Sequence, residues 1–151
     1  MNMLAIRVVA SVLMEPCRIK VFFYGLFMDV ELLRSKGAHP TAVQAASVPG
    51  YELRIGQKAT LAQNATSSAH GVVMELSHSE IELLYSDPSV SAYRPEAVLA
   101  QLADGSYVPT LCFNLVTLPA PGEVANPDYA VKWRALAARL RLPSAYVESV
   151  R

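Results

Sequence analysis

The sequence predicts an α+β fold in which a small mixed β-sheet, able to close into a barrel, is flanked by helices. Strand-like segments follow one another directly and are joined by turn signals. The few helix-like segments do not alternate with strands as they would in a parallel βαβ protein. The chain has 151 residues, of which 52% are apolar, so one domain can bury a core without disulfides or metal ions to stabilise it.

Apolar alternation and turn signals indicate where the strands lie. Residues 19–24 are β-branched and aromatic and end at Gly25, which predicts a buried strand. Pro49-Gly50 predicts a turn, 67–69 a loop, and Asp104-Gly105 a hairpin. The other strand candidates are 41–47, 51–55, 59–63, 70–76, 93–102 and 107–116.

Capping residues mark the helices. Asp29 begins a short helix that stops at Gly37, and Ser77 with Glu80 forms a capping box for a helix through Tyr85. The longest helix starts at Asn126-Pro127 and is ended by Pro143, and 144–150 reads as a terminal turn. The apolar stripe of the longest helix, which includes Tyr129 and Trp133, is typical of a core-facing surface.

Charge and cysteine usage exclude several classes of protein. Thirteen basic and thirteen acidic residues balance, so nothing favours a nucleic acid or an anionic membrane as partner. Prolines interrupt the longest uncharged stretch, which argues against a membrane span. Cys17 and Cys112 form no disulfide framework, so we expect a cytoplasmic protein. We divide the chain into an N-terminal extension (1–18), of which 1–13 would precede an alternative start at Met14, and one domain (19–151).

Common catalytic motifs are missing from the sequence. His39, His70 and His78 lack metal-ligand spacing, and there is no Walker loop, GxGxxG or GxSxG motif. We therefore expect neither a metal nor a cofactor.

Two segments carry possible chemistry. In 24–29 a buried strand runs through Gly25, which lets the backbone approach a ligand closely, into a helix whose free amides can hold an anion. Ordinary strand-to-helix turns look the same. In 84–94 an acid, Asp87, precedes Tyr93-Arg94. An enclosed acid can carry protons, but Asp before Pro is also a common turn cap.

Together these segments resemble the γ-glutamyl cyclotransferase family, including its AIG2-like and γ-glutamylamine members. The resemblance covers about 19–150 and depends on the order and spacing of its motifs. They are Tyr24-Gly25-Leu26-Phe27, Val48-Pro49-Gly50-Tyr51, Gly71-Val72-Val73-Met74-Glu75-Leu76-Ser77, Asp87, Tyr93-Arg94-Pro95, Asn126-Pro127-Asp128-Tyr129 and Leu142-Pro143-Ser144-Ala145-Tyr146-Val147.

The resemblance implies a small barrel with one internal cavity and a role as a transferase or lyase that releases 5-oxoproline. The α-amine of a small γ-glutamyl amide or amine would attack the γ-carbonyl within the same molecule. The turn residues Tyr24, Gly25, Leu26 and Phe27 would bind the substrate together with Tyr93. Asp87 would be the general acid and base, with its carboxylate pointing into the cavity.

This chain departs from the family pattern at two of these positions. Leu26 stands where the family has Ser or Thr, and Asp87 stands where it has Glu, one methylene longer. Asp29 would repel a carboxylate unless it only caps the helix, and Glu82 and Glu96 are lower-ranked bases.

Three functional hypotheses remain open at this stage. The first is a γ-glutamyl cyclotransferase. The second is a catalytically weak or inactive module that binds small molecules or a partner on the same fold. The third is an oligomeric scaffold, which predicts no cavity beside Tyr24-Gly25.

Overall fold

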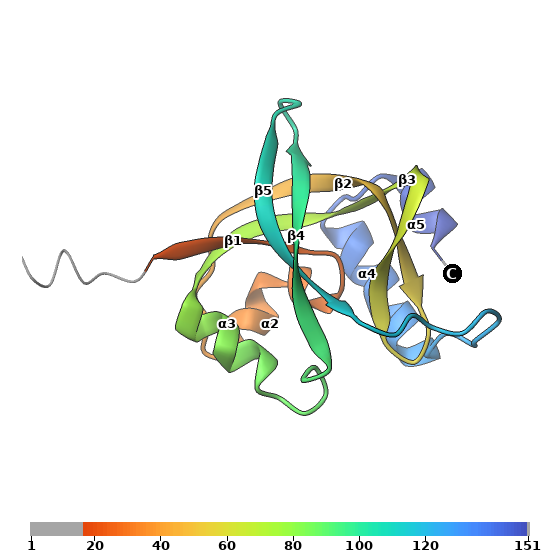
Figure 1. Ribbon diagram of the computed structural model, residues 1–151, viewed down its shortest axis with the longest axis horizontal. Coiled ribbons are helices and arrows are strands. Elements are labelled where there is room, and N and C mark those ends of the chain that lie inside the picture. Colours follow the sequence, from red (N-terminus) through yellow and green to blue (C-terminus); the bar gives the residue numbers. More distant parts are fainter. Residues whose placement is uncertain (1–16, 151) are drawn as a thin grey trace, which may run out of the picture.

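A closed five-stranded barrel organises the chain in this computed structural model, which describes residues 17–150. The strand order is β1-β3-β2-β4-β5, and the barrel is mixed because β1 runs parallel to β5 while the other neighbours are antiparallel (Figure 1). This confirms the predicted barrel. The strands are β1 (Arg18–Phe23), β2 (Thr41–Ile55), β3 (Ala59–Ser77), β4 (Tyr93–Leu102) and β5 (Tyr107–Leu115).

The two longest strands, β2 and β3, correct the sequence analysis. Each was predicted as two shorter strands, separated by the Pro49-Gly50 turn in one and by a loop at 67–69 in the other. Instead the register shifts between Pro49 and Tyr51, where Gly50 has a φ of +85°, and β2 continues beyond this bulge. Ser68 and Ala69 pair with Pro49 and Val48, so the predicted loop is part of the ladder. A proline followed by a glycine with positive φ fits a bulge as well as a turn.

The helices lie near two ends of the barrel, α2 and α3 at one and α4 and α5 at the other (Figure 1). The predicted caps are confirmed: Asp29 accepts from the amides of α2, Ser77 and Glu80 form the capping box of α3, and Asn126 caps α4. Residues 144–150, predicted as a turn, contain a short helix. The helices are the 3-10 turn η1 (Leu26–Met28), α2 (Val30–Ser35), α3 (His78–Tyr85), α4 (Pro127–Arg139) and α5 (Ser144–Ser149).

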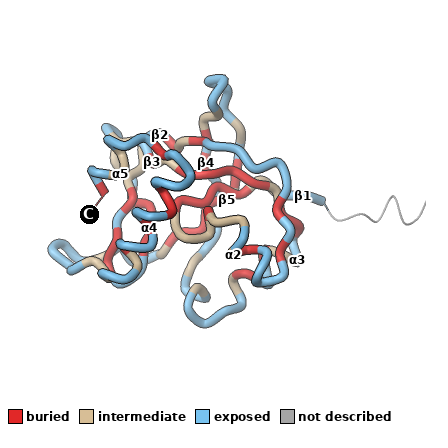
Figure 2. Tube along the Cα trace, turned by 180° about the vertical axis from the view of Figure 1, so that it is seen from behind, coloured by how far each residue is buried: buried red, intermediate tan, exposed pale blue. Residues whose placement is uncertain are grey.

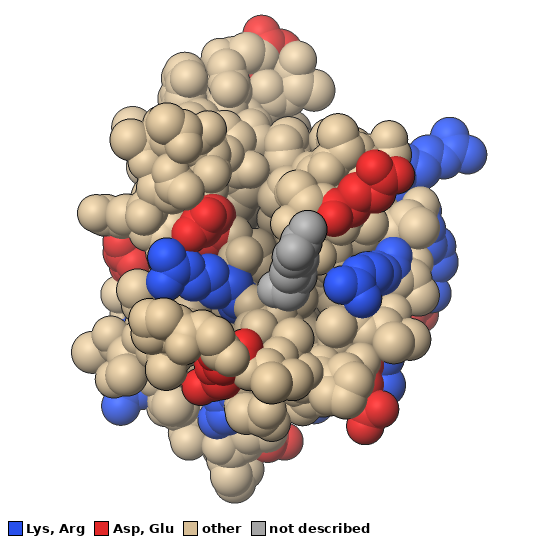
Figure 3. Space-filling model, turned by 90° about the vertical axis from the view of Figure 1, so that its right-hand side faces the viewer, with Lys and Arg blue, Asp and Glu red and all other residues tan. Residues whose placement is uncertain are grey.

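The core fills the barrel and extends to the inner face of α4 (Figure 2). Trp133 of α4 is fully buried, and its Nε1 donates to the Tyr24 carbonyl at 2.8 Å, which joins α4 to the end of β1. The prediction that Trp133 is a core residue is confirmed. On the face shown in Figure 3, acidic and basic side chains are interspersed, in keeping with the balanced charge of the chain.

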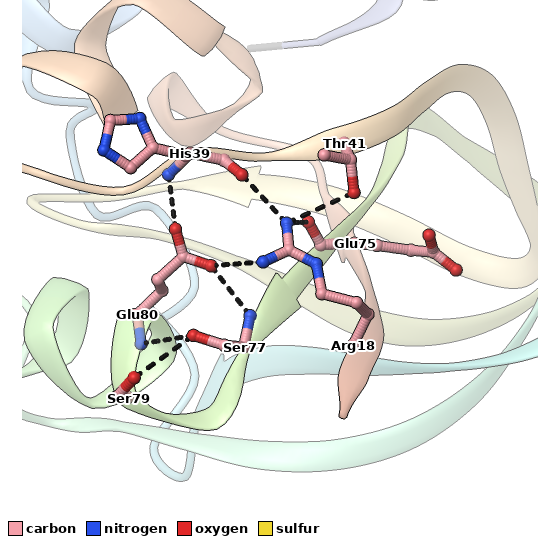
Figure 4. Close-up of polar contacts among 7 residues, drawn as sticks. All are labelled: Arg18, His39, Thr41, Glu75, Ser77, Ser79 and Glu80. Carbon is pink, nitrogen blue, oxygen red and sulfur yellow. Dashed lines mark hydrogen bonds and ion pairs between the residues drawn. The ribbon is translucent and has the colours of Figure 1, made fainter. Parts of the chain in front are cut away.

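A polar network fixes the start of β1 (Figure 4). The Arg18 guanidinium donates to Glu80 Oε1, to the carbonyls of His39 and Glu75, and to Thr41 Oγ1, at 2.8–3.2 Å. Glu80 also accepts from the amides of Ser77 and His39. Arg18 therefore belongs to the folded barrel, one residue before the expected domain start. The expected extension, apart from Cys17 and Arg18, lies outside the described residues.

Candidate functional site

A cavity of about 440 Å³ opens beside the turn that follows β1. Its walls come from β1, η1, the end of α2, the end of α3, β5, the β2–β3 turn and α4. The scaffold hypothesis, which required no cavity here, is thus contradicted. The lining residues are Phe22, Phe23, Tyr24, Gly25, Leu26, Phe27, Leu32, Lys36, Gln57, Lys58, Ala59, Tyr85, Ser89, Val90, Tyr93, Phe113 and Tyr129.

Gly25 is required at the turn because of the helix packed behind it. Its φ is −110°, so the backbone conformation alone does not demand glycine. A Cβ at this position would overlap the Tyr129 hydroxyl of α4. The close approach expected of a ligand is therefore made by Tyr129 of the chain itself.

Several amides that follow Gly25, which were expected to hold an anion, have partners within the protein. Met28 N donates to the Gly25 carbonyl and Asp29 N to the Leu26 carbonyl, both at 3.1 Å. Asp29 Oδ1 accepts from Glu31 N at 3.1 Å, and Asp29 Oδ2 pairs with Arg139 of α4. Asp29 thus caps the helix, and its negative charge is paired with Arg139. This pairing removes the expected repulsion of a bound carboxylate.

Aromatic residues make up nearly half of the cavity lining. Tyr85 stacks on Phe113 with ring centroids 4.1 Å apart and an interplanar angle of 19°, and it meets Phe27 edge-on at 5.7 Å. Phe27 in turn meets Phe23 edge-on at 6.0 Å. Leu26 and Phe27 are half-buried and line the hollow without filling it. The wall therefore offers flat apolar faces to a ligand.

The phenol hydroxyls in this wall differ in their hydrogen bonds. Tyr24 donates to the Phe113 carbonyl at 2.6 Å, and Tyr93 donates to the Ala59 carbonyl. Tyr85 has no hydrogen-bond partner for its hydroxyl among residues 17–150. Burial raises the pKa of Tyr93 to about 12 and raises the pKa values of Tyr24 and Tyr85 as well. These phenols are thus neutral at physiological pH, and the Tyr85 hydroxyl is available to a ligand.

Two lysines supply the charge of the cavity. Lys36 follows α2, Lys58 lies in the β2–β3 turn, and both side chains are exposed. Neither forms an ion pair with another residue of the described segment. The lining contains no Asp, Glu, His or Cys among residues 17–150. The cavity thus favours an anion and lacks a carboxylate or imidazole for proton transfer.

Asp87 is fully exposed and is not among the lining residues, contrary to the expectation that its carboxylate points into the cavity. Its Oδ1 accepts from Ser89 N at 2.9 Å and from Ser89 Oγ at 2.8 Å. These bonds lower the pKa of Asp87. The physical reason is that the short side chain is satisfied within its own turn, the capping role weighed for it above. Its part in a reaction stays a prediction.

The alternative bases also lie outside the cavity. Glu82 is exposed beside His78, their side-chain atoms 2.9 Å apart. Glu96 accepts from the Tyr51 hydroxyl and from Asn114 Nδ2, both at 2.9 Å. No group of three or more His, Cys, Asp or Glu within residues 17–150 is arranged to hold a metal ion.

The structure brings together all five residues predicted to bind substrate, namely Tyr24, Gly25, Leu26, Phe27 and Tyr93. Sequence reasoning missed Lys36, Lys58, Tyr85 and Tyr129. Tyr129 was read as part of the core stripe of α4, and the lysines follow a helix and occupy a turn, where solvated lysines are ordinary. Only their convergence in space reveals them.

Within the described residues, no helix is long and apolar enough to cross a membrane.

Comparison with known proteins identifies the architecture. No protein-family model matches the chain, and no curated sequence does. A solved structure described as a γ-glutamyl cyclotransferase superposes with a TM-score of 0.72 at 20% sequence identity, covering 87% of this chain and 85% of that protein. YkqA from Bacillus subtilis gives a TM-score of 0.71 at 23% identity and covers 94% of this chain, which spans 55% of YkqA.

An AIG2-like protein from Mus musculus gives a TM-score of 0.51 at 17% identity, covering 68% of this chain and 80% of that protein. Identities this low establish the arrangement of elements and leave the activity open. The closed mixed barrel with its helices has the γ-glutamyl cyclotransferase fold.

Proposed function

We propose that this chain binds a small γ-glutamyl compound in the cavity beside residues 24–27, and that binding without turnover is its function. The compound class is suggested by the shared fold and by the motifs of the sequence. The binding residues are Tyr24, Gly25, Leu26, Phe27 and Tyr93, all of which line the cavity. Lys36 and Lys58 would attract the carboxylate of the compound.

One observation carries the choice of binding over catalysis. Cyclisation needs a base that takes a proton from the α-amine, and the cavity wall contains no carboxylate or imidazole among the described residues. The neutral phenols do not replace such a base, because their pKa values are raised by burial.

The two cysteines are free thiols, which supports a cytoplasmic location.

Calorimetric titration with γ-glutamyl dipeptides, 5-oxoproline and glutamate tests the proposal. We expect saturable binding by the wild type. In Val90→Trp, a bulky side chain enters the cavity wall and should weaken binding at least about tenfold. The matched control is Val116→Trp, because Val116 is 82% exposed and does not line the cavity. Equal affinity in both variants would place binding elsewhere and refute the proposal.

A cyclotransferase that uses Asp87 is the second candidate. It is favoured by one observation: the amide and hydroxyl of Ser89 donate to Asp87 Oδ1, and Ser89 itself lines the cavity, so the acid is a near neighbour of the cavity rim. The α-amine would form a bond to the γ-carbonyl carbon, the bond to the leaving nitrogen would break, and the proton lost by the amine would pass through Asp87 to that nitrogen.

Release of 5-oxoproline distinguishes the two candidates. On the binding proposal, neither the wild type nor Asp87→Asn releases 5-oxoproline above the protein-free control. Release by the wild type that is lost in Asp87→Asn would establish the second candidate and overturn the proposal of binding without turnover.

A further inference from the structure

We infer that the γ-glutamyl compound bound here carries an aromatic group on its amide nitrogen, such as an aromatic amino acid or aromatic amine. This inference rests on the proposed function and narrows its ligand class. It is drawn from the chemistry of the cavity wall, the placement of its charges and its volume.

The aromatic wall provides the first argument. Phe27, Tyr85 and Phe113 form a continuous set of rings, with Tyr85 stacked on Phe113 and edge-on to Phe27. An aromatic ligand group gains apolar burial here together with stacked or edge-to-face contacts. A hydrophilic amide substituent that lies against the faces of these rings would lose its water there without gaining hydrogen bonds from those faces.

The charges provide the second argument. Lys36 and Lys58 are the two charged residues of the lining. No carboxylate stands among the lining residues of the described segment, so a cationic substituent such as a lysine side chain finds no counter-ion and meets two like charges. Because both lysines are exposed, a carboxylate bound to them stays at the open side while the aromatic group lies inward.

The size of the cavity provides the third argument. A volume of about 440 Å³ lies within the range of about 300–1,000 Å³ found for sites that enclose drug-sized molecules. A γ-glutamyl group alone is smaller than such a molecule and would leave apolar wall in contact with water. An aromatic substituent covers that wall.

Calorimetric titration of the full chain with γ-glutamylphenylalanine, γ-glutamylglycine, γ-glutamyllysine linked through the lysine α-amine, which leaves the side-chain ammonium free, and N-acetylphenylalanine tests the inference. We expect γ-glutamylphenylalanine to bind at least about tenfold more tightly than γ-glutamylglycine, and the lysine compound to bind most weakly. Equal affinities, or tighter binding of the glycine or lysine compound, would overturn the inference while leaving the proposed function intact.

The remaining outcomes distinguish a failure of the proposed function from a failure of the aromatic preference alone. If no γ-glutamyl compound binds, the proposed function and this inference both fail. Binding of N-acetylphenylalanine in that case would show that the cavity accepts aromatic carboxylates of another class.

Two sets of variants locate the preference. Tyr85→Leu keeps an apolar side chain but removes the stacked ring, so the preference for the phenylalanine compound over the glycine compound should fall at least about threefold. Lys36→Met and Lys58→Met should each weaken binding of γ-glutamylphenylalanine about threefold, and more at low than at high salt. Lys132→Met is the control, because Lys132 is exposed on α4 outside the cavity. An unchanged preference in Tyr85→Leu, in a variant that melts as a folded protein, would overturn the inference.

Discussion

The two ends of α3 differ in whether their polar side chains are hydrogen-bonded within the protein. At its beginning, both Glu80 carboxylate oxygens accept hydrogen bonds, from Arg18, Ser77 and His39. At its end, the Tyr85 hydroxyl has no partner within residues 17–150, although the ring is packed tightly against Phe113. A polar group whose bonds are complete within the protein stabilises the fold, whereas one packed in place with its bond unmade is available to a ligand.

The largest effect is expected at the beginning of α3. In Glu80→Gln the carboxamide nitrogen must face one of the present donors, and the charge opposite Arg18 is lost. We expect unfolding in urea to show a loss of about 2 kcal/mol. Glu31→Gln is the control, because the Glu31 side chain is 78% exposed in its pair with Arg34, and it should cost less than about 0.5 kcal/mol. Similar losses in both variants would show that the hydrogen bonds of Glu80 with Arg18, Ser77 and His39 stabilise the fold no more than an exposed ion pair does.

A matched pair of hydroxyl deletions in the cavity should give a smaller effect. Tyr24→Phe leaves the Phe113 carbonyl without its donor, and Pro95, the ladder partner of Phe113, has no amide to replace it. The expected loss of unfolding free energy is about 1–2 kcal/mol.

Tyr85→Phe removes a hydroxyl that has no protein partner, so its unfolding free energy should change by less than about 0.5 kcal/mol. Denaturation of both variants under the same conditions makes the comparison direct. A loss in Tyr85→Phe as large as that in Tyr24→Phe would show that the Tyr85 hydroxyl is a structural group.

The smallest effect is expected in the pH dependence of stability. Burial acts to raise the pKa of Glu80, but hydrogen bonds from Ser77 and His39 and the charge of Arg18 outweigh it, so the pKa lies below its ordinary value. The stability contributed by the charged carboxylate is therefore complete above about pH 4.3, the unfolded value, and is lost as the pH falls through the lower folded value.

Denaturation midpoints of the wild type and Glu80→Gln between pH 7 and pH 3 test this sign. The gap between the two proteins should narrow as the pH falls. Asp87 and Asp104, whose pKa values are also lowered, are present in both proteins and cancel in the difference. A gap that widens in acid would contradict the assignment.

The same contrast explains how far the sequence could predict the structure. Caps are local, so Asp29, Ser77, Glu80 and Asn126 were assigned correctly from their spacing alone. The barrel followed from the order of the strands and from the resemblance. The continuous β2 and β3 could not be predicted from Pro49-Gly50, because a turn and a bulge use the same residues there.

The candidate site was predicted where its residues are contiguous and at Tyr93, which the resemblance supplied. Residues 24–27 form one turn and were found together, whereas Lys36, Lys58, Tyr85 and Tyr129 come from four separate elements. Asp87 shows the opposite failure. Its sequence fits both a proton carrier and a turn cap, and the two nearby Ser89 donors place its carboxylate in the turn.

The contact of Tyr129 with the Gly25 turn has a consequence for the order of assembly during translation. All five barrel strands leave the ribosome before α4, yet Tyr129 and Trp133 complete the backing of the turn. A nascent chain that has emerged only as far as β5 contains all five barrel strands. It still lacks α4, which contributes Tyr129 to the cavity wall. On the proposed function, we therefore expect ligand binding only after the α4 segment has emerged and docked.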